Sequence, residues 1–197
     1  MIAVLDYGAG NLTSVGKALS AIDAPFIVTN RAGDLYDAAG IIVPGVGNFE
    51  ATGSIDEDVR KALKVCAAGM PVLGVCLGLQ FLFEGSDEAP DADGLDLLKG
   101  RCFKLPAGQK VPHVGWNTVE IVRRSRILDG ISDGTSFYFT HSYAAPVTTA
   151  CVGRTDYTIP FASVVESGNA FGVQFHPEKS GDAGLRVLRN FLEFTQC

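Results

Sequence analysis

Short runs of apolar residues alternate with helical spacings through the first half of the chain. Four such runs are typical of buried strands and lie at residues 2–5, 26–28, 41–43 and 72–75. Apolar side chains three and four positions apart predict helices over 12–22 and 55–68, and long apolar side chains predict a packed helix over 77–83. Strands that alternate with helices in this way predict a parallel, doubly wound sheet with sites at the carboxyl ends of its strands.

The pattern changes after residue 83. Residues 86–96 are acidic and contain proline and glycine, so we expect a surface loop there. Short strands without long helices follow at 102–105, 119–122, 137–139, 161–165 and 171–175. We expect these strands to be antiparallel or mixed and to extend the same sheet, and an amphipathic helix over 185–194 to close the chain. Since no repeat or linker interrupts the pattern, it predicts one three-layer α/β domain over residues 1–197.

Composition narrows the class of protein. The chain has 197 residues, of which 47% are hydrophobic, and 22 acidic against 16 basic residues give a net charge of -6. Its basic segments are too brief to track a phosphate backbone, so nucleic-acid binding is not expected. The uncharged stretch 65–83 is interrupted by glycines and a proline, which predicts a helix end, a turn and a buried strand and not a membrane span.

The five cysteines, at positions 66, 76, 102, 151 and 197, are scattered and form no Cys-x-x-Cys pair. This spacing predicts neither a metal site nor a disulfide framework, and it favours the reducing cytoplasm. The first residues have no basic segment before the apolar run and meet Asp6 early, so we do not expect them to be a signal peptide.

Cys76 falls where the strand 72–75 meets the next helix, with Gly74 and Gly78 two residues to either side. A nucleophile on a sharp strand-to-helix turn needs small neighbours, because the backbone doubles back on itself. The pattern therefore predicts a nucleophilic thiol on an elbow. The alternative is a buried structural cysteine, since free cysteine is among the most buried residue types.

A histidine and an acid follow the strand 171–175. Side chains at i and i+2 share a face of an extended chain, and Pro177 favours extended backbone at the residue before it, so Glu178 is expected beside His176. A cysteine, a histidine and an acid that orients it form a nucleophilic triad. An ordinary strand end is the alternative for this segment, and we expect His113 and His141 to be packed rather than catalytic.

Glycines after the third strand offer an oxyanion site. The segment 44–47, Pro-Gly-Val-Gly, leaves the sheet at the edge where Cys76 emerges, and its N–H groups with that of Leu77 can hold a tetrahedral oxyanion. A simple glycine-rich turn is the alternative. A dinucleotide site is not expected, because Gly8 and Gly10 lack the third glycine of that fingerprint, and no cofactor is predicted.

These motifs carry a family resemblance. Gly-Val-Cys-Leu-Gly-Leu-Gln at 74–80 with His-Pro-Glu at 176–178 resembles the triad (class I) glutamine amidotransferases. Four further segments resemble one group within that family, the glutaminase subunits of imidazole glycerol phosphate synthases in histidine biosynthesis. They are Asp-Tyr-Gly-Ala-Gly-Asn-Leu at 6–12, Pro-Gly-Val-Gly at 44–47, Pro-His-Val-Gly-Trp-Asn at 112–117 and His-Ser-Tyr at 141–143.

The resemblance implies a flavodoxin-like amidotransferase fold and a reaction. Cys76 would attack the side-chain amide of glutamine, and His176, supported by Glu178, would move the proton to the departing ammonia. The backbone amides of Val46 and Leu77 would hold the oxyanion. Glutamine itself would be bound by Gly47, Gln80, Ser142 and Tyr143.

The resemblance also implies a partner. Ammonia would pass to a (β/α)₈-barrel cyclase subunit in a heterodimer, docked on a face that includes Asn11, Trp116, Asn117, Tyr138 and Lys179. Because uncoupled hydrolysis would waste glutamine, we expect the glycine-rich segment 45–47 to act as a switch that flips its peptides when the partner is engaged. The alternatives are the glutaminase subunit of pyridoxal phosphate synthase, a stand-alone cysteine hydrolase, and a non-catalytic module.

Overall fold

The computed structural model describes residues 1–195 and contains a large mixed sheet. Within those residues the sheet has nine strands in the order β2-β1-β3-β4-β13-β12-β11-β8-β9. The parallel half comprises β2 (Phe26–Thr29), β1 (Ile2–Leu5), β3 (Gly40–Val43), β4 (Val72–Val75) and β13 (Ala170–Val173). The antiparallel half comprises β12 (Ile159–Ser167), β11 (Cys151–Tyr157), β8 (His113–Ile121) and β9 (Thr135–His141). The prediction of a parallel sheet extended by antiparallel strands is confirmed.

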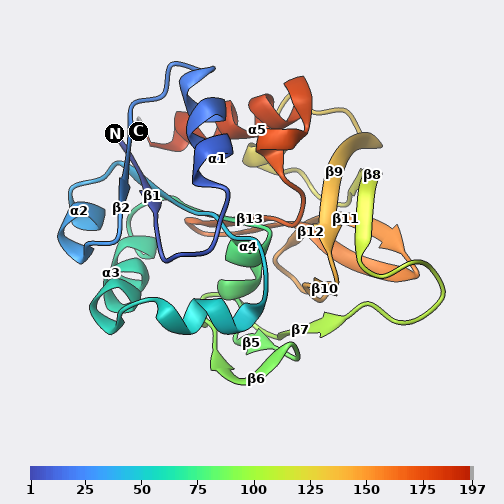
Figure 1. Cartoon of the computed structure of the whole chain (residues 1–197). Coiled ribbons are helices and arrows are strands. Elements are labelled where there is room, and N and C mark those ends of the chain that lie inside the picture. The colour runs from blue at the N-terminus through green and yellow to red at the C-terminus, as the bar shows by residue number, and fades with distance from the viewer. Residues whose placement is uncertain (196–197) are drawn as a thin grey trace.

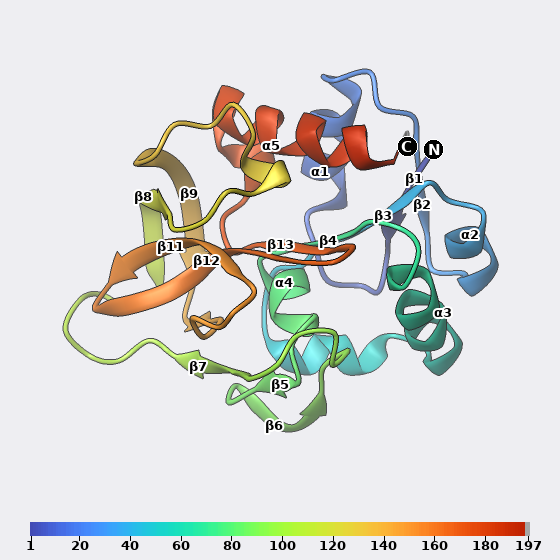
Figure 2. The ribbon, with the colours of Figure 1, turned by 180° about the vertical axis from the view of Figure 1, so that it is seen from behind.

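Helices cover both faces of the sheet and make three layers, as Figures 1 and 2 show. One face is covered by α1 (Leu12–Ser20) and α5 (Gly181–Phe194), with the short turn η2 (Arg126–Leu128) beside α5. The opposite face carries α2 (Ala32–Tyr36), the 3₁₀ helix η1 (Phe49–Ser54), α3 (Glu57–Ala67) and α4 (Leu77–Phe81). The sequence did not predict α2, since five residues are too few to show a helical period.

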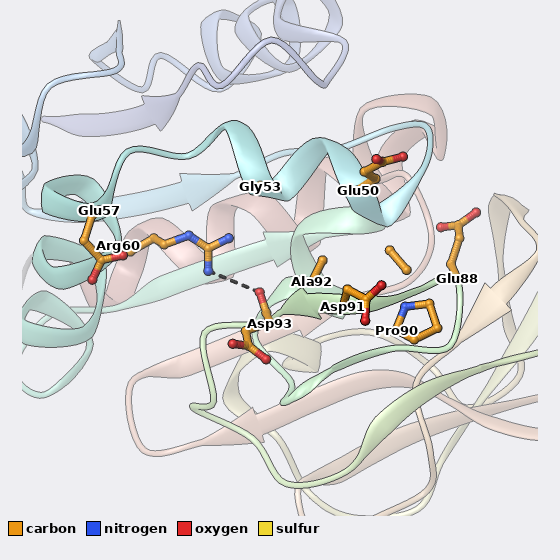
Figure 3. Close-up of a pocket in the computed structure, with 10 residues that line it drawn as sticks. Glu50, Gly53, Glu57, Arg60, Glu88, Pro90, Asp91, Ala92 and Asp93 are labelled. Carbon is orange, nitrogen blue, oxygen red and sulfur yellow. Dashed lines mark hydrogen bonds between the residues drawn. The ribbon is translucent and has the colours of Figure 1, made fainter.

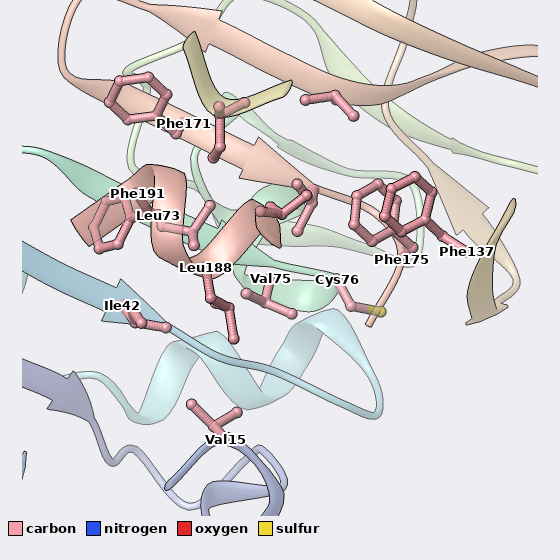
Figure 4. Close-up of a cluster of buried hydrophobic side chains, with 14 of the residues drawn as sticks. Val15, Ile42, Leu73, Val75, Cys76, Phe137, Phe171, Phe175, Leu188 and Phe191 are labelled. Atoms are coloured by element: carbon pink, nitrogen blue, oxygen red, sulfur yellow. The ribbon is translucent and has the colours of Figure 1, made fainter. Parts of the chain in front are cut away.

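Strand alternation divides the buried side chains between two cores. In β1, Ile2 and Val4 belong to the core beneath α1 and α5, whereas Ala3 and Leu5 belong to the core beneath α2, α3 and α4. Because both faces are covered, these parallel strands read as continuous apolar runs. Figure 4 shows the first core, with Cys76 at its edge beyond Val75.

The acidic segment 86–96 is not the surface loop that the sequence predicts. It contributes β5 (Gly85–Ser86) and β6 (Ala89–Asp93), which join β7 (Arg101–Lys104) and β10 (Tyr143–Ala144) in a second sheet of order β10-β7-β5-β6 among the described residues. Backbone pairing, and not an alternation of apolar side chains, builds this hairpin. The strand predicted at 102–105 corresponds to β7. Because β7 pairs with β10 and β5, it belongs to the second sheet and does not extend the first.

Other differences concern boundaries. The strand predicted at 119–122 is the end of the longer β8, and the strand predicted at 137–139 is the middle of the longer β9. The sequence did not predict β11. The helix α3 begins at Glu57 because the side chain of Asp56 caps it, accepting from the N–H of Asp58 at 2.8 Å. No helix within residues 1–195 is long and apolar enough to cross a membrane.

The close contact of α4 with β3 allows a test of the fold. We expect Gly78→Ala to lower the free energy of unfolding by roughly 3 kcal/mol, because an added Cβ would lie 1.8 Å from the carbonyl oxygen of Val43. Gly53→Ala is the matched control, since nothing lies within 4 Å of a Cβ at that position. Urea unfolding of both variants measures the difference, and equal stabilities would contradict this account of the contact.

Candidate active site

Cys76 occupies a sharp elbow between β4 and α4. Its backbone has φ 53° and ψ -105°, in a region that residues with a side chain rarely adopt, and its N–H donates to the carbonyl of Val173 at 2.8 Å. The flanking glycines make this possible. A Cβ on Gly74 would lie 2.5 Å from the carbonyl oxygen of Gly78, so a side chain there would prevent the turn from closing.

His176 and Glu178 form a buried pair in the segment that follows β13. The Nδ1 of His176 lies 2.8 Å from Oε1 of Glu178, and the side chains are 1% and 2% exposed. The sequence analysis predicted this pairing on the assumption that residues 176–178 are extended. In the structure only His176 is extended, and Pro177–Lys179 form a 3₁₀ turn, η3. The turn still carries the carboxylate back to the imidazole, and Nε2 makes no hydrogen bond within the described residues.

Adjacent strands bring the thiol and the imidazole to the same sheet edge. Val75 of β4 is in register with Val173 of β13, so Cys76 and the segment that follows β13 leave the sheet together. Burial lowers the pKa of His176, but the interaction with Cys76 and the hydrogen bond and charge of Glu178 outweigh burial and raise the pKa to about 10. The imidazole therefore favours its protonated form next to the sulfur.

A hollow of about 190 Å³ opens in front of the thiol. Its lining includes Cys76 and Leu77, and all four residues predicted to bind glutamine, namely Gly47, Gln80, Ser142 and Tyr143. The amide of Gln80 donates to the carbonyl of Tyr143 at 2.9 Å, which ties α4 to the opposite wall of the hollow.

Glu88, which the sequence analysis missed, also lines this hollow. Its carboxylate accepts from the N–H of Phe49 at 2.8 Å, and burial raises its pKa. A wider hollow of about 590 Å³ adjoins it between η1, α3 and β6, and Glu88 lines both. Figure 3 shows the wider hollow, where Arg60 donates to the carbonyl of Asp93 among several carboxylates. The acidic composition of 86–96 was the one available signal for Glu88.

Comparisons with known proteins agree with this site. The model of the family described as glutamine amidotransferase class-I matches residues 3–194. The chain is 48% identical to the imidazole glycerol phosphate synthase subunit HisH of Moorella thermoacetica, over 99% of this chain and 95% of the relative. It is 47% identical to the subunit HisH of Methanothermobacter thermautotrophicus over the full length of both. The chain belongs to the class I glutamine amidotransferases. Its similarity to these relatives confirms the narrower resemblance to the synthase subunits.

Solved structures support the amidotransferase fold. A crystal structure described as a glutamine amidotransferase superposes with a TM-score of 0.75 at 17% identity, over 100% of this chain and 99% of that one. The structure of PurLQS from Thermotoga maritima gives 0.73 at 20% identity, over 98% and 97%. At these identities the likeness concerns the fold alone.

The segment 45–47, which the sequence predicts to form the oxyanion site, presents a carbonyl to the elbow. The N–H of Leu77, a predicted oxyanion donor, instead donates to the carbonyl oxygen of Gly45 at 3.4 Å. Gly47 has φ +104°, which glycine adopts readily, and Val46 is 37% exposed. The hydroxyl of Tyr7 holds the start of the segment by donating to the carbonyl of Pro44 at 2.8 Å.

His113 and His141 are buried, as expected, but they also support the hollow. The Nδ1 of His141 lies 2.9 Å from the carbonyl oxygen of Tyr143, which can only accept, so Nδ1 carries the proton. The Nε2 of His141 then accepts from Nδ1 of His113 at 3.1 Å. Burial lowers the pKa of His113 to about 4 and, with the charge of His113 opposing protonation, that of His141 to about 3.

The residues predicted for the partner face fall into three places. Trp116 and Tyr138 are cross-strand neighbours with ring centroids 6.1 Å apart, and Nζ of Lys179 lies 5.8 Å from the Tyr138 ring. Asn11 caps α1 by accepting from the N–H of Ser14. The side chain of Asn117 points to the other face of β8, where it contacts His113 and the carbonyl of Asp156, so the structure does not bring it together with Trp116.

The buried pair predicts a pH dependence of stability. Because the pKa of His176 is raised above its unfolded value, this imidazole binds more protons in the folded amidotransferase than in the unfolded chain from about pH 6.5 to about pH 10. Its contribution to the free energy of unfolding is fully present below this window and falls as pH rises through it, by up to about 1.4 kcal/mol per pH unit. In Glu178→Gln the fall should be smaller.

Urea unfolding near pH 7 and near pH 9 measures this slope for both proteins. Glu50→Gln makes the same change at an exposed carboxylate and should keep the slope of the unmodified chain. Equal slopes for Glu178→Gln and the unmodified chain would show that Glu178 does not hold the proton on His176.

Proposed function

We propose that this chain hydrolyses glutamine with Cys76, His176 and Glu178 and delivers the ammonia to the cyclase subunit of imidazole glycerol phosphate synthase. The observation that carries the proposal is the convergence, at one sheet edge, of a thiol on a strained elbow with a buried imidazole whose other nitrogen is held by a carboxylate. Similarity to HisH subunits over the whole chain supports the pathway.

The reaction follows from the proton positions. With His176 protonated, the sulfur of Cys76 is available as a thiolate, which attacks the side-chain carbonyl carbon of glutamine to form a C–S bond. The tetrahedral intermediate collapses, the C–N bond breaks, and His176 gives its proton to the departing ammonia. A water molecule, deprotonated by His176, then attacks the thioester, and the C–S bond breaks to release glutamate and the thiolate.

The polar lining of the small hollow suits the other end of glutamine. Both N–H groups of the Gln80 amide are used internally, by the carbonyl of Tyr143 and by Oε1 of Gln174, so Gln80 offers only its oxygen to a ligand. Glu88 adds a carboxylate to the same lining. Acceptors are what an α-ammonium group requires, so we assign Gln80 and Glu88 to that end, and Gly47, Ser142 and Tyr143 to the rest of the substrate.

The oxyanion site requires a movement of the segment 45–47. Val46 and Leu77 can donate to one oxyanion only after the peptide between Gly45 and Val46 rotates, which removes the Gly45 carbonyl from Leu77 and turns the N–H of Val46 inward. The glycines lower the barrier to such a rotation. This arrangement supports a glutaminase that is incompetent until its partner binds.

The exposed cluster of Trp116, Tyr138 and Lys179 is the proposed docking face for a (β/α)₈-barrel cyclase subunit. Trp116 is 60% exposed, and exposed aromatic side chains of this size are typical of interface anchors. Asn11 lies at the start of α1, and α1 packs against η3, the turn that carries Lys179. Asn117 is proposed to act on this face only indirectly, through β8.

Three other functions are less well supported. The relatives carry the name of the imidazole glycerol phosphate synthase subunit, which disfavours the glutaminase of pyridoxal phosphate synthase. A stand-alone cysteine hydrolase would need an oxyanion site formed without a partner, and here the Gly45 carbonyl accepts from the N–H of Leu77, one of the two proposed donors. A non-catalytic module would not require the strained backbone at Cys76.

Removal of the nucleophile tests the assignment of the thiol. We expect Cys76→Ala to abolish glutamine hydrolysis while the complex with the cyclase subunit still makes imidazole glycerol phosphate from added ammonium, since only the ammonia source is lost. Product formation from glutamine and from ammonium salts, measured on one preparation, checks this. Loss of both activities would assign Cys76 a structural role.

Partner dependence tests the switch. We expect the purified chain alone to release glutamate from glutamine at least ~10²-fold more slowly than the chain with the cyclase subunit and its nucleotide ligand, which is the typical effect of one missing oxyanion donor. Titration of the partner into a fixed amount of the chain measures the ratio. Full activity of the isolated chain would rule out the rotation of the Gly45–Val46 peptide as the controlling step.

A further inference from the structure

The sulfur of Cys76 has a polar neighbour with no part in the triad. Nε2 of Gln174 lies 3.5 Å from Sγ of Cys76, and the Gln174 side chain is fully buried. We propose that Gln174 is a further catalytic residue, whose amide N–H donates to the sulfur and stabilises its thiolate form. The inference rests on the proposed glutaminase function and adds to it a second donor besides His176.

The direction of the Gln174 amide follows from its neighbours. The carbonyl oxygen of Tyr143 can only accept, so the atom of Gln80 that lies 2.9 Å from it must be the nitrogen. The same nitrogen lies 3.3 Å from the Gln174 side chain, which must therefore present its oxygen to Gln80. This leaves the NH₂ group of Gln174 facing the sulfur, and a flipped amide would place two donors against each other.

The sheet explains why Gln174 reaches this position. Phe171, Val173 and Phe175 point into the core beneath α1 and α5, so alternation turns Gln174 toward α4 and the elbow. Its N–H donates to the carbonyl of Ser163 on β12 at 2.9 Å, which fixes the backbone. Gln174 is therefore held by one strand, oriented by α4, and aimed at the thiol.

The other groups around the sulfur make a donor valuable. The carbonyl of Thr140 lies 3.8 Å from Sγ and can accept only from the neutral thiol. The hydroxyl of Tyr7 is held neutral by burial, which together with the charge of Cys76 raises its pKa. Neither the Thr140 carbonyl nor the Tyr7 hydroxyl therefore stabilises a negative charge on the sulfur, whereas His176 does. A hydrogen bond to a charged group contributes more than one to a neutral group, so the Gln174 N–H favours the thiolate over the thiol.

The donor acts on two steps of the reaction. Before attack it raises the fraction of Cys76 present as thiolate. When the thioester is hydrolysed, the C–S bond breaks, the electron pair returns to sulfur, and the N–H meets the charge that develops there. Gln174 does not line the hollow assigned to glutamine, so its removal should change kcat far more than KM.

The test is the pH dependence of alkylation of Cys76 by iodoacetamide in the full chain, followed by mass spectrometry of the peptide that contains Cys76. For Gln174→Met, which keeps the length of the side chain without the donor, we expect the midpoint of the rate profile to move up by about one pH unit. Gln174→Glu should move it in the same direction, because a carboxylate repels the thiolate. With the cyclase subunit present, kcat of Gln174→Met should fall about tenfold with KM within about twofold.

Gln109→Met makes the same substitution at an exposed glutamine and should leave the profile unchanged. A midpoint unchanged in both Gln174 variants, with folding retained by circular dichroism, would overturn the proposal. If Gln174→Met does not fold, an unchanged midpoint in the nearly isosteric Gln174→Glu alone still overturns the proposal, because both the lost donor and the added charge should raise that midpoint. Alkylation needs no glutamine, so absence of glutaminase activity in the unmodified complex would refute the proposed function without affecting this measurement.

Discussion

The close approach of Gly78 to the carbonyl of Val43 is the constraint on which the site depends. Without a side chain at Gly78, α4 can press against the end of β3 while its first turn carries the strained Cys76. The same contact sets Leu77 beside Gly45, so the proposed nucleophile and the proposed oxyanion segment are positioned by one packing event. β13 lies on the other side of β4 and supplies His176. Three parallel strands in fixed register therefore assemble the proposed active site, although a hundred positions separate Cys76 from His176 in the sequence.

Much of this arrangement could be predicted from the sequence, because local patterns encode it. Continuous apolar runs identify strands that are buried on both faces, and Gly-x-Cys-x-Gly after such a run identifies the elbow. The hairpin of β5 and β6 could not be predicted in the same way. It is held by backbone pairing with β7, and its acidic side chains carry the composition of a loop. His176 and Glu178 do pair, but through a 3₁₀ turn, since a proline that favours extended backbone before it also starts helical turns well.

The parts of the site that the sequence analysis missed depend on tertiary contacts. Glu88 reaches the small hollow only because the hairpin folds against η1, where the carboxylate meets the N–H of Phe49. Gln174 left a weak signal, as the one polar residue between Phe171 and Phe175 in a buried strand. A polar side chain at such a position requires a partner, but the sequence alone does not indicate that the partner is a sulfur. The sequence analysis also placed Trp116 and Asn117 on one docking face, but adjacent residues of β8 point to opposite faces of the sheet.

The three histidines show how the environment separates roles that composition cannot. All three are buried, and burial by itself disfavours the imidazolium. His176 gains a carboxylate on Nδ1 and a sulfur nearby, and its pKa rises. His141 and His113 gain only neutral partners, and their pKa values fall. A neutral imidazole has one donor and one acceptor, and this pair uses both His141 nitrogens and the Nδ1 of His113 in one defined tautomeric arrangement. The neutral pair therefore suits a fixed wall behind Tyr143, whereas the protonated form that His176 favours suits the proton transfer proposed at Cys76.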